Sequence, residues 1–253
     1  MINILLCGAN GKMGKAVTKA AENLSDIKIA AGFDISPDTT GDFPVYNDLS
    51  LIVEKIDCII DFSHPSVFDN MLAFAKNNKI PYIICTTGLS DVQKKAFVEA
   101  SSSSPIFFSA NMSVGVNLIT ALSKMASKAL EENFDIEIIE KHHNQKIDAP
   151  SGTALAIADA ISDTVSFNPK YIHDRHSVRK KREKDEIGIH AIRGGNIVGE
   201  HTVIFAGQDE IIEIKHSATS KEVFAQGALR AARFMYEKGA GLYDMTDVLE
   251  SEL

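Results

Sequence analysis

Cysteine is scarce in this sequence, which also lacks both an excess of basic residues and a long apolar run. Cys7, Cys58 and Cys85 lie in or near apolar segments without the spacing of metal ligands, so we interpret them as core residues in a reducing compartment. A net charge of −8 argues against nucleic acid as the main partner, because a phosphate-binding surface usually makes a domain basic. No apolar run is long enough to span a bilayer. These absences argue against a metal site, a nucleic-acid partner and a membrane partner.

The remaining composition is that of an ordinary globular protein. The chain has 253 residues, enough for one large domain or two modest ones with a substantial core. Its apolar content of 45% and charged content of 24% are typical of soluble domains. The first residues already have the pattern of a strand, which leaves no room for a signal peptide, so we expect a cytoplasmic protein.

A glycine-rich turn follows the first expected strand. Residues 2–7 have the pattern of a short buried strand, and residues 15–24 have that of a helix. Between them Gly8, Gly11 and Gly14 stand in the order of the dinucleotide-binding fingerprint. In that fingerprint the glycines permit a tight turn, close approach of the backbone to the pyrophosphate, and close packing of helix on strand. The helix N-terminus then faces the negative charge of the ligand.

An acidic residue, Asp34, ends the second expected strand, which spans residues 27–33. At this position a carboxylate binds the hydroxyl groups of the adenosine ribose, and we favour that role over that of a simple turn residue. The residues that follow, Ile35 to Pro37, include no lysine or arginine that would bind a 2′-phosphate. The sequence therefore predicts that NADH binds at least as well as NADPH.

Further alternation of strands and helices follows. Strands are expected at 56–62, 80–85 and 105–109, and helices at 66–77 and 91–100. Repeats of this length predict a parallel sheet with right-handed crossovers.

In such sheets ligands bind beyond the carboxyl ends of the strands, where this sequence places several polar residues. These residues are Ser63, Thr86, Thr87 and Asn111. For Ser63 and Asn111 the capping of a turn is an equally good interpretation.

The most distinctive stretch of the sequence runs from residue 140 to residue 154 and reads EKHHNQKIDAPSGTA. It follows an apolar segment at 134–139, expected to be a strand, and leads into an Ala-rich segment at 154–161, expected to be a buried helix. Ser151 is a credible N-cap for that helix, which leaves the first amides of the helix able to attract an anion. With two histidines and a lysine beside it, this pattern indicates a site for a small substrate that carries carboxylates.

The same stretch closely resembles the signature of the dihydrodipicolinate reductases (4-hydroxy-tetrahydrodipicolinate reductases) of lysine and diaminopimelate biosynthesis, and the resemblance extends over the whole chain. It implies NAD(P)H-dependent reduction of 4-hydroxy-tetrahydrodipicolinate, a small ring with two carboxylates, to tetrahydrodipicolinate. By match to the family motif, His142 is the acid/base residue and Lys146 the proton donor, although the sequence leaves open which of the two delivers the proton. His143, Gly152 and Thr153 are expected to hold the substrate carboxylates.

The resemblance also implies cofactor contacts in the first half of the chain. In the family, the positions that match residues 85–87 and 110–113 contact the cofactor, and they follow strands whose ends are expected to bind a ligand. Some family members use both dinucleotides, so we expect NADH as the cofactor with NADPH also accepted. The candidate cofactor-binding residues are Gly8, Ala9, Asn10, Gly11, Lys12, Met13, Asp34, Cys85, Thr86, Thr87, Ala110, Asn111, Met112 and Ser113.

The second half of the chain turns to alternating strands, at 187–193, 197–206 and 210–216. Residues 194–196 and 207–209 between them have the composition of hairpin turns, which predicts an antiparallel arrangement. With the strand before the signature, these strands are expected to form a second sheet. The histidines expected in its strands, interpreted as structural, are His190, His201 and His216.

The predicted fold class is α/β, with a Rossmann-type doubly wound parallel sheet and a second α+β domain that contains a mixed or antiparallel sheet. We expect a discontinuous dinucleotide-binding domain over residues 1–112 and 217–253, with its last long helix at 220–237. Residues 113–216 would form a substrate-binding and tetramerisation domain. Family members are typically tetramers built through the second sheet, so the resemblance predicts a homotetramer.

Two other kinds of protein have a similar architecture. One is another dehydrogenase of amino-acid metabolism, acting on aspartate or homoserine. The other is a regulator that senses a dinucleotide without turnover. A regulator would need an appendage that binds DNA or a partner, and the sequence shows no helix-turn-helix and no basic domain. We interpret the one basic segment, residues 175–184, as a solvated, mobile loop.

Overall fold

The computed structural model of the chain describes residues 1–38 and 41–252. Residues 39, 40 and 253, which the sequence assigned to the first domain, lie outside this description. The chain forms two compact units, Met1–Val114 with Lys221–Leu253, and Gly115–Ser220, which are described in turn.

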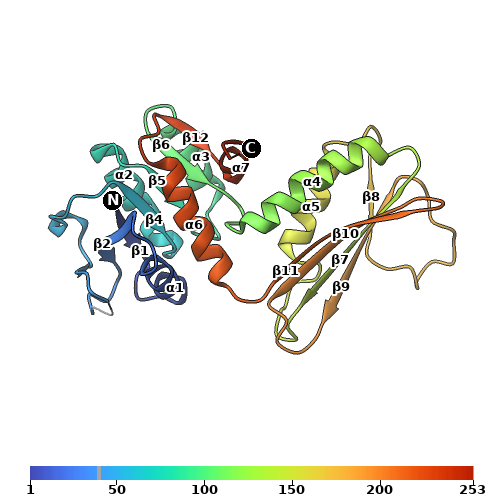
Figure 1. Ribbon diagram of the computed structural model, residues 1–253, viewed down its shortest axis with the longest axis horizontal. Coiled ribbons are helices and arrows are strands. Elements are labelled where there is room, and N and C mark those ends of the chain that lie inside the picture. The colour runs from blue at the N-terminus through green and yellow to red at the C-terminus, as the bar shows by residue number, and fades with distance from the viewer. Residues whose placement is uncertain (39–40, 253) are drawn as a thin grey trace. The chain divides into compact units, whose positions relative to one another are not determined.

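A parallel sheet forms the centre of the first unit (Figure 1). In the described part of the chain its strands are β1 (Ile2–Cys7), β2 (Ile27–Phe33), β3 (Val45–Tyr46), β4 (Cys58–Asp61), β5 (Tyr82–Ile84), β6 (Pro105–Phe108) and β12 (Gly241–Tyr243). Their order is β12-β6-β5-β4-β1-β2-β3, and every neighbouring pair is parallel. The chain therefore runs outward from β1 in both directions, which confirms the Rossmann-type sheet and places the switch point between β1 and β4.

Helices cover both faces of this sheet. They are α1 (Lys12–Ala21), α2 (Phe68–Asn78), α3 (Asp91–Ala100), α6 (Glu222–Met235) and α7 (Met245–Glu250), with short 3₁₀ turns η1 (Leu49–Leu51) and η2 (Pro65–Val67). Alternate residues of β1 point to opposite faces, as the period of a strand requires. Ile4 and Leu6 pack in the apolar cluster with α1 and α6, whereas Leu5 and Cys7 pack in the cluster with α2 and α3. All four side chains are fully buried.

Local sequence signals located most of these elements. The helix expected at 91–100 has those bounds, and its N-cap Ser90 forms a capping box with Gln93. Helix α1 begins at Lys12, three residues before the expected start, because the third glycine of the turn lies inside the helix. The sequence did not predict β3, β12 or α7, because all three are short. In addition, β3 and β12 are the two edge strands of the sheet.

The second unit contains a mixed sheet with helices on one face. Its strands are β7 (Asp135–His142), β8 (Lys170–Ile172), β9 (Glu186–Arg193), β10 (Gly199–Ala206) and β11 (Ile211–Ala218), and its helices are α4 (Val114–Leu130) and α5 (Gly152–Ser162). Ile136 and Ile138 of β7 and Val203 and Phe205 of β10 pack against α5, including Ile157, in one buried cluster. This arrangement confirms a second α+β unit with a mixed sheet.

One expected hairpin of this sheet is wrong. Strands β9 and β10 are not neighbours, because the strand order is β11-β10-β7-β9-β8 and β7 lies between them. Strand β9 runs parallel to β7, while β10 runs antiparallel to it. Residues 194–196 therefore connect two strands that flank a third, although Gly195 has a positive φ of 49° as in a tight turn. The hairpin expected at 207–209 is present, since β10 and β11 pair antiparallel.

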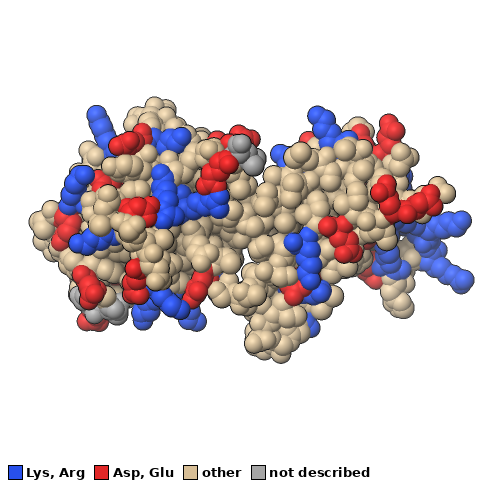
Figure 2. All heavy atoms as spheres, viewed as in Figure 1, with Lys and Arg blue, Asp and Glu red and all other residues tan. Residues whose placement is uncertain are grey.

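The basic segment 175–184 is mostly exposed to solvent, as expected, but two of its arginines tie it to this sheet. Arg182 donates from Nε to Glu137 at 3.0 Å and from Nη1 to Asp135 at 2.9 Å. Arg175 donates to Glu186 and to Glu137, each at 2.7 Å. Acidic side chains lie beside basic ones on the face displayed in Figure 2 as well. No local pattern predicts these ion pairs, because the acids lie 38 to 47 residues away along the chain or on β9.

The buried carboxylate of Glu186 gives this attachment a pH dependence. Hydrogen bonds from Arg175 and then Lys180 lower the pKa of Glu186 to about 2. A depressed folded-state pKa means that the stabilisation is complete above the unfolded-state pKa, about 4.3, and is lost as the pH falls toward 2.

We therefore predict that Glu186→Gln lowers the melting temperature at pH 7, and that its difference from the parent protein shrinks as the pH falls from about 4.3 toward 2. Melting curves by circular dichroism at a series of pH values measure this difference. A gap that stays constant across that range would show that the charge of Glu186 does not stabilise the fold.

Candidate active site

The turn after β1 adopts a conformation that requires glycine. Gly8 has a φ of 73°, and a Cβ added to it would lie 2.8 Å from the carbonyl oxygen of Phe62. A Cβ on Gly14, inside α1, would collide with the carbonyl oxygen of Gly8. Helix α1 thus begins directly against the end of β1, with its N-cap at Gly11. This geometry leaves backbone and helix N-terminus open to the phosphates of a dinucleotide.

Asp34 lies beside the same turn. Its Oδ2 accepts a hydrogen bond from the backbone N–H of Asn10 at 2.9 Å. The Asn10 side chain in turn donates to the carbonyl oxygens of Ser36 and Asp38 at 2.8 and 2.9 Å. These bonds fix the loop after β2 against the glycine-rich turn. They hold the Asp34 carboxylate beside the glycine-rich turn, just after the end of β2.

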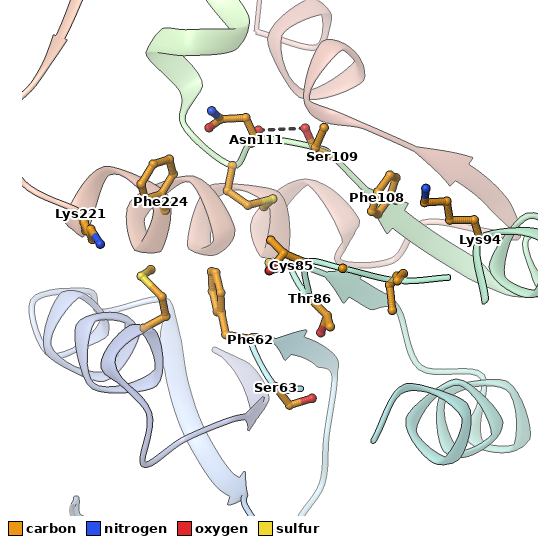
Figure 3. Close-up of a pocket in the computed structure, with 16 residues that line it drawn as sticks. Phe62, Ser63, Cys85, Thr86, Lys94, Phe108, Ser109, Asn111, Lys221 and Phe224 are labelled. Carbon is orange, nitrogen blue, oxygen red and sulfur yellow. Dashed lines mark hydrogen bonds between the residues drawn. The ribbon is translucent and has the colours of Figure 1, made fainter. Parts of the chain in front are cut away.

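A cavity of about 630 Å³ lies at the carboxyl ends of β4, β5 and β6. Figure 3 shows that Phe62, Phe108 and Phe224 come to it from the end of β4, from β6 and from α6. Among the candidate cofactor residues, those that line it are Met13, Cys85, Thr86, Thr87, Ala110, Asn111 and Met112. Burial, and then the Asp61 carboxylate, raise the pKa of the Cys85 thiol well above its usual value, so this thiol is protonated at neutral pH.

The other candidate cofactor residues lie outside the lining of this cavity. Six of them form the glycine-rich turn and its acid, and Ser113 is buried behind Asn111, whose Oδ1 accepts from the Ser113 N–H at 2.9 Å. Asn111 therefore both caps a turn and lines the cavity. The sequence pattern points to the polar Ser63 but not to the aromatic side chains of the cavity, because apolar residues at strand ends resemble core residues. The lining residues without a sequence assignment are Phe62, Gly88, Leu89, Lys94, Phe108, Ser109, Lys221 and Phe224.

A buried carboxylate, that of Asp61, holds the turn at the entrance of this cavity. It is the last residue of β4 and is fully buried. Its Oδ1 accepts from the N–H of Ser63 at 2.8 Å, and its Oδ2 accepts from the hydroxyl of Tyr82 at 2.5 Å. Burial, and then Asp61, raise the pKa of Tyr82 well above its usual value, so the hydroxyl stays a donor. Asp61 therefore caps the turn that carries Ser63 and Phe62 into the cavity.

A second cluster of polar side chains lies in the Gly115–Ser220 unit, at the end of β7. The carboxylate of Glu140 is fully buried. Its Oε2 lies 2.6 Å from Nδ1 of His142, and Arg193 on β9 donates to both carboxylate oxygens at 2.6 and 2.8 Å. The backbone N–H of Ser151 donates to Oε1 at 3.0 Å. The cluster therefore joins β7, β9 and the start of α5 through one carboxylate.

Ser151 caps α5, as expected, and links the cluster to His201. Its Oγ accepts from the N–H of Ala154 at 3.2 Å and lies 3.1 Å from Nε2 of His201 on β10. The rings of His142 and His201 make an edge contact with centroids 5.3 Å apart. Burial, and then His142, lower the pKa of His201 to about 4, so this ring is neutral at pH 7. His201, expected to be purely structural, thus contacts the candidate catalytic group.

Lys146 lies in the loop between β7 and α5. Its Nζ is 2.9 Å from Oδ1 of Asp148, and its side chain is 22% exposed against 58% for that of Asp148. The hydrogen bond from Lys146 is the main cause that lowers the pKa of Asp148, with a smaller contribution from the N–H of Gly152. A carboxylate can therefore be held here by an ammonium group and the first amide of a helix. His143 begins this loop, and Thr153 is the second residue of α5.

Comparisons with known proteins agree with this geometry. The family model described as "Dihydrodipicolinate reductase, N-terminus" matches residues 2–112, and that described as "Dihydrodipicolinate reductase, C-terminus" matches residues 115–249. The chain belongs to the dihydrodipicolinate reductase family. A 4-hydroxy-tetrahydrodipicolinate reductase of Clostridium tetani is 51% identical, over 99% of this chain and 98% of its own length. One from Clostridium novyi is 48% identical over the full length of both chains.

The fold of the family is also seen in a solved structure. A dipicolinate-bound dihydrodipicolinate reductase from Paenisporosarcina sp. TG-14 superposes with a TM-score of 0.81, over 96% of this chain and 97% of its own, at 24% identity. The family's N-terminal match coincides with the parallel sheet, so the first unit is a nucleotide-binding domain that implies NAD(P)H. Within residues 1–38 and 41–252, no helix is long and apolar enough to cross a membrane. The same residues contain no group of three or more His, Cys, Asp or Glu side chains arranged to hold a metal ion.

Proposed function

We propose that this chain reduces 4-hydroxy-tetrahydrodipicolinate to tetrahydrodipicolinate with NAD(P)H, in lysine and diaminopimelate biosynthesis. The observation that carries the proposal is the 51% identity, over 99% of the chain, to a reductase of that name. An assay tests it directly: the upstream synthase supplies the labile substrate in the cuvette, and nicotinamide absorbance is followed. Absence of synthase-dependent oxidation of NADH and of NADPH would contradict the proposal.

The first unit would hold the cofactor. Gly8, Gly11 and the N-terminus of α1 would bind the pyrophosphate, and Asp34 the adenosine ribose. The cavity at the ends of β4 to β6 would hold the nicotinamide half, where its aromatic walls exclude water and its strand-end polar groups orient the ring. When bound, NAD(P)H supplies the hydride for the conjugated double bond of the substrate.

The second unit would hold the substrate and provide its proton. His142 would act as the acid/base group and Lys146 as the proton donor, because His142 ends β7 and Lys146 lies in the loop that leads to α5. His143 and the amides of Gly152 and Thr153 would bind the carboxylates of the ring. A Cβ on Gly152 would meet no atom within 4 Å, which leaves open space for a ligand at that amide. A substrate carboxylate would take over the contact that Lys146 makes with Asp148.

We also propose a cytoplasmic location and a homotetramer. The thiols of Cys7, Cys58 and Cys85 are free, as is usual in a reducing compartment. The face of the second sheet opposite α4 and α5 exposes apolar side chains, among them Ile192 at 46% and Ile211 at 67%. An exposed apolar sheet face and its edge strands favour association with further copies.

The first prediction of this proposal concerns the choice of cofactor. The Asp34 carboxylate should bind the ribose hydroxyls of NADH and repel a 2′-phosphate, so NADH should bind at least as tightly as NADPH. Asp34→Asn removes the charge and should raise the affinity for NADPH relative to NADH. Fluorescence titration of both dinucleotides measures the ratio. NADPH binding to the parent protein more than about tenfold tighter, or about 1.4 kcal/mol, would contradict the role of Asp34.

The second prediction concerns Lys146. Lys146→Ala should lower turnover by about 10²–10⁴, the usual effect of losing a general acid. The affinity for NADH should change little, because the glycine-rich turn and Asp34 lie in the other unit. Lys141→Ala is a matched control, since Lys141 also pairs with a carboxylate, that of Glu200 at 3.3 Å, but points to the other face of β7. Near-normal turnover in the folded Lys146→Ala protein would remove this lysine from the mechanism.

The third prediction concerns assembly. Light scattering should give the mass of a tetramer, and Ile211→Asp, which places a charge on the open sheet face, should shift the protein to smaller species. Val92→Asp, at a 77% exposed position of α3, is the control and should leave the mass unchanged. A monomeric parent protein at working concentration would refute the tetramer.

A further inference from the structure

Glu140 makes four hydrogen bonds in the candidate substrate site, although neither the sequence pattern nor the resemblance assigned it a role. Four donors converge on its buried carboxylate: Nδ1 of His142 at 2.6 Å, two guanidinium nitrogens of Arg193 at 2.6 and 2.8 Å, and the N–H of Ser151 at 3.0 Å. Burial alone acts to raise the pKa of Glu140, but the hydrogen bonds from Arg193, His142 and Ser151 lower it overall. The group is therefore a carboxylate at neutral pH and can only accept hydrogen bonds.

An acceptor at 2.6 Å determines which nitrogen of His142 carries hydrogen. Nδ1 must donate to Glu140, so in the neutral ring Nε2 is the basic nitrogen and exchanges the proton. The other side of the ring is fixed by β10, where a Cβ on Gly199 would lie 3.1 Å from Nε2 of His142. Glu140 thus holds the Nδ1 side of the ring, and the backbone of β10 passes close to the Nε2 side at a position that only glycine fits easily.

The same carboxylate reaches the anion-binding part of the site. Through the Ser151 N–H it holds the N-cap of α5, whose next amides face the proposed carboxylate position. Arg193 extends the connection, because its Nη2 also donates to the backbone carbonyl of Asp148 at 2.7 Å. The segment that carries Lys146 is thus held at Asp148 and at Ser151 by one ion pair.

We propose that Glu140, with Arg193, is the positioning residue of the substrate site: it fixes the Nδ1–H tautomer of His142 and aligns that ring with Lys146 and the N-terminus of α5. This inference rests on the proposed function for the part that concerns turnover. The part that concerns the tautomer does not, because it is a property of the free protein.

Glu140→Gln and Glu137→Gln form a matched pair for the test. Both acids lie on β7, and each contacts one histidine and at least one arginine, since Glu137 lies 2.8 Å from Nε2 of His190 and accepts from Arg182 at 3.0 Å. Only Glu140 contacts the site. Glutamine keeps the shape of the side chain but replaces one acceptor oxygen with a donor, so it cannot satisfy four donors.

Two readouts are measured on each variant. Long-range ¹H–¹⁵N correlation spectra of the histidine rings report the His142 tautomer, with its signals assigned by their loss in His142→Asn. The synthase-coupled assay reports kcat and KM, and an NADH titration reports the other unit. We expect a pure Nδ1–H tautomer in the parent protein, a mixed one in Glu140→Gln, and a fall in kcat of about 10–100-fold, as is usual when the partner that orients a histidine is lost. Glu137→Gln should match the parent protein in tautomer and kcat, and NADH affinity should be unchanged throughout.

The parent spectrum alone can overturn the inference, whether or not Glu140→Gln folds: an Nε2–H tautomer of His142 would do so. So would a folded Glu140→Gln protein that keeps both the pure tautomer and its kcat, or an equal loss of kcat in Glu137→Gln. If Glu140→Gln loses the pure Nδ1–H tautomer but keeps a normal kcat, then Glu140 does fix the tautomer of His142. The same result would remove His142 from the proposed mechanism.

Discussion

Burial of negative charge is the constraint on which both units depend. Among the described residues three carboxylates are buried, those of Asp61, Glu140 and Glu186. A buried carboxylate is costly unless donors surround it, so each one organises the groups near it. Asp61 accepts hydrogen bonds from the N–H of Ser63 and the hydroxyl of Tyr82, and these bonds fix the turn at the entrance of the cavity. The local structure of each site is therefore set by an acid that need not touch a ligand.

The position of these acids follows from the topology of the sheets. In a parallel sheet the carboxyl ends of the strands lie at one edge, so the residues that end β4, β5 and β6 come together although they are far apart in sequence. In the second unit β7 is central, with β9 parallel on one side and β10 antiparallel on the other. The end of β7 thus meets the end of β9 and the start of β10, which brings Arg193 and His201 to Glu140. Hairpin connections alone would have given a different set of neighbours.

The sequence predicted those features that depend on local chemistry. The glycine-rich turn, the Ser90 cap of α3 and the Ser151 cap of α5 each depend on a few adjacent residues, and the structure contains all three. The pairing of β9, the attachment of the basic segment and the role of Arg193 depend on contacts across the sheet, which no local pattern encodes. Phe224 could not be predicted for another reason. An aromatic residue on an amphipathic helix has the pattern of a core residue, and only the structure shows that this one lines a cavity. The candidate residues could thus be named from the sequence, but the groups that orient them could not.

In the proposed substrate site, the buried charges and the exposed charges would have two different tasks. The whole chain is acidic, with a net charge of −8, so attraction of a dicarboxylate must come from local cations. Arg193 is paired with a fully buried carboxylate and His201 is neutral, so neither adds an unbalanced positive charge for an incoming anion. Lys146 is paired instead with Asp148, whose side chain is 58% exposed and can return to water when another carboxylate replaces it. On the proposed function, the buried pair of Glu140 and Arg193 would position the site, and the exposed pair of Lys146 and Asp148 would offer a cation that a substrate carboxylate can take over.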